Sequence, residues 1–172
     1  MALWGVTDAD ESKPKWAVRG SVCDPQNIFA TSEGWVLRHY KNAAKTAYWD
    51  EVLVSVDGLV GAGGRGTNTL GGADITAVFF EETGYAGGAT GSVVVIYNEQ
   101  VNVTNGATLV VRNTTDSANI TATAAAQTST NRVEFTFTAA ATGKAHAIQA
   151  QTISGTIVDT TGGCLLYTSP SP

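Results

Sequence analysis

Alternating apolar and polar residues mark the second half of the chain as strand-forming. The clearest case is residues 132–138, where Val133, Phe135 and Phe137 fall on one face and polar residues on the other. An alternation with a period of two predicts a half-buried β-strand. Comparable apolar segments, separated by turn signals such as Asn105-Gly106, predict further strands over residues 74–80, 92–97, 101–104, 108–112, 119–123, 146–150 and 156–159.

These closely spaced strands predict the fold class. A series of short strands with turns between them is typical of an all-β, immunoglobulin-like β-sandwich, which we place at residues 73–163. A helix is conceivable only in the alanine-rich residues 122–126, and the threonines beside them disfavour it.

The first 60 residues predict an extended arm followed by a small β module. Pro14 prevents a helix in the polar first 20 residues. Residues 34–40 and 51–56 are the two strand candidates, and we expect them to form a hairpin with Tyr48 and Trp49 in the connecting loop. The glycine-rich residues 61–72 predict a linker between the module at 1–60 and the sandwich.

The last nine residues, 164–172, differ sharply from the Thr-, Ala- and Gly-rich chain before them. They resemble the peptide obtained when a metagenomic read runs past its insert into a sequencing adapter. We therefore interpret them as a non-native tail, with native sequence ending near Gly163; a natural tail rich in Ser and Pro is the alternative. Without Cys164, Cys23 is a lone thiol, and no disulfide framework is expected.

Composition and charge narrow the possible partners. Charged residues make up 15% of the chain, the net charge is −5, and the only Lys and Arg residues after Arg65 are Arg112, Arg132 and Lys144. No basic patch is interleaved with aromatic residues, so we expect no nucleic-acid partner. No window approaches the length of apolar sequence that spans a bilayer, so we expect no membrane segment, and residues 1–8 lack the features of a signal peptide.

Motifs for catalysis, cofactors and metals are weak. Gly61, Gly63 and Gly66 have a dinucleotide-binding spacing, but the segment after them cannot begin the helix that such a site needs. His39 and His146 lack the ligand spacing of a zinc site, and the acidic turn at residues 8–11 departs from the calcium-loop pattern. We therefore predict no catalytic residue, no cofactor and no metal site, and we expect that the protein is not an enzyme.

Two resemblances suggest a function. Residues 1–16, with the Gly34-Trp35-Val36 strand after them, resemble small virion structural proteins from marine T4-like tailed phages. Residues 92–163 resemble bacterial immunoglobulin-like modules through the segments at 97–104, 107–111, 133–137 and 155–159. These resemblances imply a β-sandwich and carry over no catalytic residue.

The function expected from this resemblance is that of a non-enzymatic virion structural protein, present in many copies as a decoration or host-contact component. Its partners would be other virion proteins and, for a host-contact component, a glycan on the host surface. Trp4 and Trp16 in the arm are the expected docking residues.

Two other interpretations stay open. The chain could be a fragment of a bacterial cell-surface adhesin, which predicts further sandwiches beyond residue 163. It could also be a carbohydrate-binding module in which Trp35, Tyr48 and Trp49 stack on sugar rings. The alternative for these three aromatic residues is that they fill the core of the small β module.

Overall fold

The computed structural model describes residues 19–31, 34–54, 73 and 75–160, without the side chains of residues 150–152. The arm with Trp4 and Trp16, the linker at 61–72 and the tail at 164–172 lie outside the described residues. Within them, the prediction of an all-β fold is confirmed. They form ten strands and one short 3-10 turn, η2 (Pro25–Asn27), arranged in two sheets.

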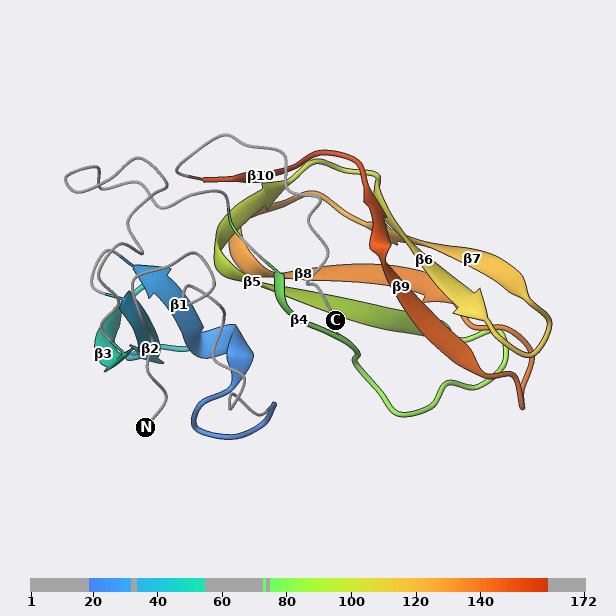
Figure 1. The fold of residues 1–172 in the computed structure, drawn as a ribbon, viewed down its shortest axis with the longest axis horizontal. Helices are drawn as coiled ribbons and strands as arrows, with labels where there is room; N and C mark the ends of the chain where they lie inside the picture. The colour runs from blue at the N-terminus through green and yellow to red at the C-terminus, as the bar shows by residue number, and fades with distance from the viewer. Residues whose placement is uncertain (1–18, 32–33, 55–72, 74, 161–172) are drawn as a thin grey trace.

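The larger sheet holds seven strands and encloses the main core (Figure 1). Its strands follow the order β10-β5-β8-β7-β6-β9, and β4 pairs with β5 beside β10. The strand bounds are β4 (Ile75–Phe80), β5 (Thr90–Val103), β6 (Ala107–Asn113), β7 (Ala118–Ala124), β8 (Gln127–Thr138), β9 (His146–Ser154) and β10 (Ile157–Asp159).

This sheet curls on itself into a sandwich-like arrangement with a Greek-key path. Strands β6, β7 and β8 follow one another as neighbours, and β5 returns to pair with β8. One face of each strand points inward, so that Val95 of β5, Leu109 of β6 and Phe135 of β8 belong to one buried cluster. The alternation in residues 132–138 therefore reports the inward face of β8. Residues 122–126 form no helix, because β7 pairs with β6 up to Ala124.

Two predicted strands, at 92–97 and 101–104, are one strand in the structure. β5 runs from Thr90 to Val103 and pairs with β8 on both sides of an irregularity between Ile96 and Val101. We expected the polar residues 98–100 to separate two strands. Instead, they form a bulged section that bends the strand while its pairing continues.

The smaller sheet is formed by β1 (Ile28–Thr31), β2 (Gly34–Tyr40) and β3 (Tyr48–Val54), in that order. The prediction for β2 is confirmed residue by residue, whereas β1 was not foreseen. β3 begins at Tyr48 rather than at residue 51, so the expectation that Tyr48 and Trp49 lie in a loop is wrong. Cross-strand pairs from Tyr40–Tyr48 to Trp35–Val54 explain the difference, because they extend the ladder almost to the turn.

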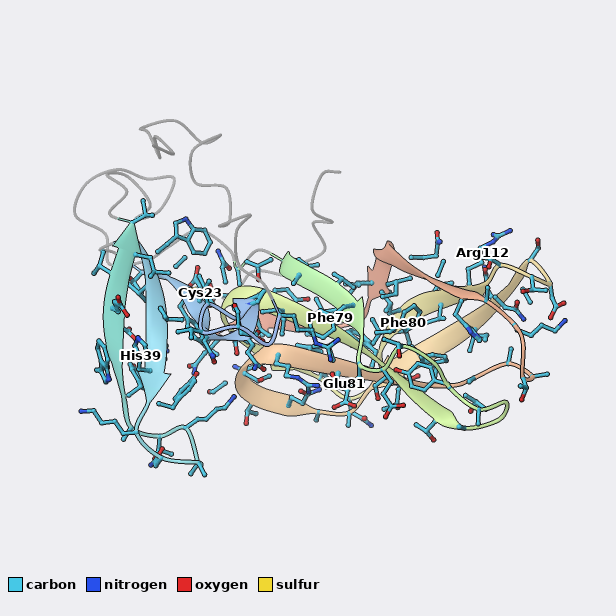
Figure 2. All side chains as sticks on the ribbon, turned by 90° about the horizontal axis from the view of Figure 1, so that it is seen from below. Cys23, His39, Phe79, Phe80, Glu81 and Arg112 are labelled. Atoms are coloured by element: carbon cyan, nitrogen blue, oxygen red, sulfur yellow. The ribbon has the colours of Figure 1, made fainter. Side chains whose placement is uncertain are left out.

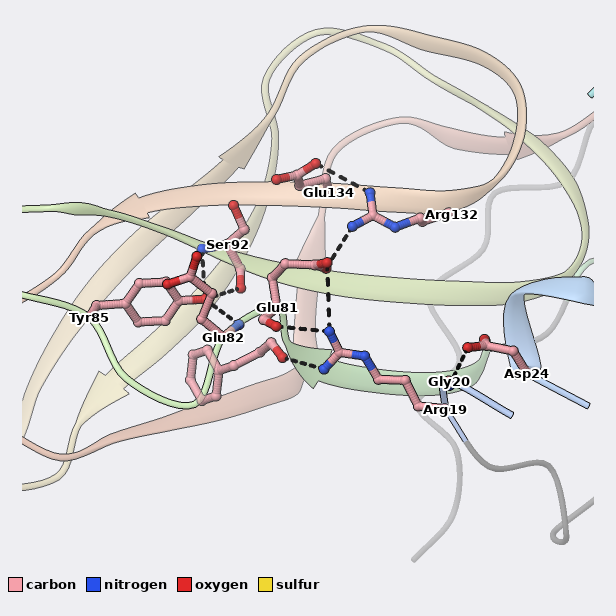
Figure 3. A network of polar contacts seen from close by, with 10 residues as sticks. Arg19, Gly20, Asp24, Glu81, Glu82, Tyr85, Ser92, Arg132 and Glu134 are labelled. Atoms are coloured by element: carbon pink, nitrogen blue, oxygen red, sulfur yellow. Dashed lines mark hydrogen bonds and ion pairs between the residues drawn. The ribbon is translucent and has the colours of Figure 1, made fainter. Parts of the chain in front are cut away.

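A polar network around Glu81, which follows β4, connects the described segment before the small sheet to the large sheet (Figure 3). The Glu81 carboxylate lies 2.6 Å from Arg132 Nη2 of β8 and 3.6 Å from Arg19 Nη2 of the N-terminal segment. Arg19 also donates hydrogen bonds to the carbonyls of Phe80 and Glu81, at 3.1 and 2.8 Å. Glu81 therefore links the segment that precedes the small sheet to the sandwich.

Candidate functional site

The hairpin of β2 and β3 belongs to the small sheet and lies at the opposite end of the molecule from the turn between β6 and β7 (Figure 1). Its turn is built around Asn42, whose side-chain oxygen accepts hydrogen bonds from the amides of Thr46 and Ala47 at 3.0 and 3.3 Å. Lys45 takes a positive φ of 57°, and Lys41 donates to the Ala47 carbonyl at 2.8 Å. An asparagine that replaces backbone partners in this way fixes the tight turn and therefore the strand register.

Large apolar side chains are exposed along β3. Trp49 is 49% exposed, Tyr48 47% and Val52 46%. Trp35, by contrast, is 1% exposed and packs in the small core with Ile28 and Leu37. The three aromatic residues proposed for sugar stacking therefore separate: Trp35 fills the core, out of reach of a ligand, while Tyr48 and Trp49 face solvent. We refer to His39, Tyr40, Tyr48, Trp49 and Val52 as the hairpin surface.

On one face of the hairpin, Trp49 is held by a stacked histidine. The imidazole of His39 lies parallel to the indole, with ring centroids 4.1 Å apart and an angle of 12° between the planes. His39 Nε2 is 2.8 Å from a carboxylate oxygen of Glu51 on the same strand as Trp49. The indole is therefore fixed from one side and presents its other side outward. Figure 2 shows His39 on this sheet, far from Arg112 at the opposite end of the molecule.

On the other face, Tyr48 is held by an arginine. The Arg38 guanidinium lies 3.8 Å from the centre of the Tyr48 ring and 4.2 Å from that of Phe29. It also forms two hydrogen bonds of 2.9 Å to the Asp50 carboxylate. Burial opposes the charge on Arg38, but the hydrogen bonds and charge of Asp50 outweigh it, so the pKa of Arg38 is raised. Tyr40 completes this face with an edge contact to Tyr48.

These contacts make the hairpin surface a rigid, largely aromatic projection. Neighbouring residues of a strand point to opposite faces, so Tyr48 and Trp49 cannot form one flat platform for a sugar ring. They form instead two sides of a wedge. Exposed Trp and Tyr with a fixed Arg beside them have the composition of energetic centres in protein interfaces. Among the described strands, β3 is moreover at the edge of its sheet, a position that natural proteins usually protect from contact.

The cross-strand pairs that fix Tyr48 and Trp49 were not identified from the sequence, although their spacing along the chain is regular. Residues equally distant from Ala44 face each other, as in the pairs Arg38–Asp50 and His39–Trp49. These pairs can be read from the sequence only when the centre of the turn is known. The predicted loop, which included Tyr48 and Trp49, placed that centre too far along the chain.

The residues considered for catalysis and metal binding occupy separate places. His39 belongs to the hairpin surface, whereas His146 begins β9 and accepts a hydrogen bond from the Ala140 amide through Nε2 at 3.2 Å. Cys23 is a free, partly buried thiol beside the small core. In the part of the chain that the structure describes, no three His, Cys, Asp or Glu side chains gather as a metal site would require. Those residues also include no helix long and apolar enough to cross a bilayer.

Comparison with known proteins gives no relative. No protein-family model, curated protein or solved structure matches the chain.

Proposed function

We propose that this chain is a non-enzymatic structural protein of a tailed-phage particle, attached to a neighbouring subunit through the hairpin surface. The observation that supports attachment here is the exposure of Trp49 and Tyr48 on an edge strand, each held rigid by a polar neighbour. Side chains already fixed in one rotamer lose little entropy on binding, so they contribute more of their contact energy to affinity.

The phage assignment rests on the resemblance of residues 1–16 and 34–36, and the assembly role rests on the hairpin surface. In a symmetric assembly, every copy of a protein attaches through the same surface patch. A wedge with aromatic residues on both sides is suited to insertion between two elements of a partner. Trp4 and Trp16 stay proposed as additional docking residues.

Peptide mass spectrometry tests where the protein resides. Virus-sized particles and cell envelopes from a marine sample that contains the gene would be separated by density and digested with trypsin. The peptide from Asn113 to Arg132 should be enriched with capsid and tail peptides. Enrichment with envelope proteins would contradict the phage assignment and favour the alternative, a bacterial cell-surface adhesin.

A binding measurement with the recombinant full chain tests the hairpin surface. Truncation of an interface tryptophan at an energetic centre costs at least about 2 kcal/mol, which corresponds to about 30-fold in Kd. Trp49→Ala should therefore weaken binding to purified particles by about 30-fold or more. Val22→Ala is the matched control, because Val22 is an apolar residue that is 78% exposed at a different place. Equal binding by both variants would show that attachment uses another surface.

A further inference from the structure

A second candidate site lies at the other end of the molecule, where the loops after β4 and before β9 meet. A cleft of about 220 Å³ opens between residues 80–85 and 144–146. Its lining combines aromatic rings with both signs of charge: Phe80, Glu82, Thr83, Tyr85, Lys144 and His146. This volume is smaller than the few hundred Å³ of a typical site for a drug-sized ligand, so the cleft takes a single ring-sized group.

The walls of the cleft are fixed by hydrogen bonds within the loops. The Tyr85 hydroxyl accepts from the amides of Glu82 and Ser92 at 3.1 and 3.2 Å and donates to the Ser92 carbonyl at 2.9 Å (Figure 3). These bonds hold the first loop folded over β5. The Tyr85 ring also packs edge-on against Phe80 and Phe137, with centroids 6.4 and 5.6 Å away. The aromatic side of the cleft is therefore preformed.

The second loop is fixed to the first. The Gly88 amide donates to the Ala139 carbonyl at 3.0 Å, and the Ala139 amide donates to the Ala89 carbonyl at 2.8 Å. Contact at Gly87 is so close that an added Cβ would lie 2.5 Å from the amide nitrogen of Thr142. A site whose walls are already in place requires little ordering when a ligand binds.

The polar groups of the cleft supply both donors and an acceptor. Because His146 Nε2 accepts the Ala140 amide, the ring proton lies on Nδ1, which makes no hydrogen bond to the described residues and can donate one. Lys144 adds an ammonium group, which lies 2.8 Å from Asp116. Glu82 is exposed, and its carboxylate makes no hydrogen bond or ion pair with any residue in the described part of the chain, so it is available as an acceptor.

We infer that this cleft binds one pyranose ring of a cell-surface polysaccharide. A pyranose has an apolar C–H face that suits the rings of Phe80 and Tyr85, and hydroxyls that both donate and accept. The opposite charges of Glu82 and Lys144 favour neither a free anion nor a cation as the ligand. The loops of the cleft lie at the end of the sandwich away from the hairpin surface (Figure 1), so a particle-bound protein would present them outward. This last step alone rests on the proposed function.

A glycan array followed by calorimetry on the full recombinant chain tests the site. The probes are bacterial O-antigen and capsule polysaccharides together with their component mono- and disaccharides, and the wild type should bind at least one. Hydrogen bonds to charged groups are strong enough that Glu82→Ala and Lys144→Gln should each weaken the best glycan about tenfold or more. Trp49→Ala is the matched control and should bind that glycan with unchanged Kd.

Other outcomes overturn the inference and separate it from the proposed function. Absence of glycan binding by the wild type would refute the pyranose site, whatever the hairpin does. Loss of glycan binding in Trp49→Ala with normal binding in Glu82→Ala would move the sugar site to the hairpin. If Glu82→Ala instead loses attachment to particles, the cleft serves a protein partner. Loss of particle binding in Trp49→Ala alone would leave both sites as argued.

Discussion

Gly91 of β5 provides a sharp test of the packing inside the sandwich. It is paired with Phe137 of β8, whose ring covers the glycine on the inward face. A Cβ at Gly91 would lie 2.6 and 2.8 Å from two carbons of that ring, which is closer than real Cβ contacts come. Phe137 is itself only 4% exposed and packs against Phe80, Tyr85 and His146, so its ring cannot move aside freely.

The size of the effect follows from two opposing terms. Replacing glycine by alanine at an ordinary φ stabilises a protein by about 0.4–1 kcal/mol, because the unfolded chain loses freedom. Overpacking a buried site costs about 1–3 kcal/mol. We therefore expect Gly91→Ala to lower the free energy of unfolding by about 1–2 kcal/mol in urea denaturation. Gly84→Ala is the control, since a Cβ there meets nothing within 4 Å, and it should be neutral or stabilising.

A double variant identifies the clash as the cause. Phe137→Leu removes the ring atoms that the new Cβ meets, and alone should cost about 1 kcal/mol. If the reasoning is right, Gly91→Ala combined with Phe137→Leu is less destabilised than the sum of the single variants, with a coupling of about 1 kcal/mol. Simple additivity, or a Gly91→Ala variant as stable as Gly84→Ala, would refute the packing argument.

Three further predictions concern stability. The Tyr97 hydroxyl is buried and has no hydrogen-bond partner among the described residues, so Tyr97→Phe should raise the unfolding free energy by about 1 kcal/mol; a loss of stability would contradict this. The pKa of Glu134 is lowered, chiefly by a hydrogen bond from Ser92, so its stabilising contribution is present above the ordinary pKa of 4.5 and is lost as pH falls through the lowered value. Urea titrations at pH 7 and pH 3 should show a smaller pH dependence for Glu134→Gln than for wild type, and equal dependence would disprove it. Gly155 has φ +104° and a Cβ there would lie 2.6 Å from Ala107 Cα, so Gly155→Ala should cost about 2–4 kcal/mol by thermal melting, and a neutral result would show that the backbone relaxes.

The sequence by itself determined the all-β class and most of the strands, because these depend on local patterns. A period of two is visible in Val133, Phe135 and Phe137 without any partner strand. Turn residues such as Asn105-Gly106 likewise act within a few residues, and Gly106 does take the positive φ of 91° that a turn favours.

Tertiary structure decided everything that depends on which strand lies beside which. In the sequence, Trp35, Tyr48 and Trp49 are three aromatic residues that could each be buried or exposed. The register of β2 with its neighbours buries Trp35 and exposes Tyr48 and Trp49. The cleft near Tyr85 and His146 joins loops that are about sixty residues apart in the chain. Local patterns cannot contain such pairs, because register and sheet closure are set by burial summed over the whole core.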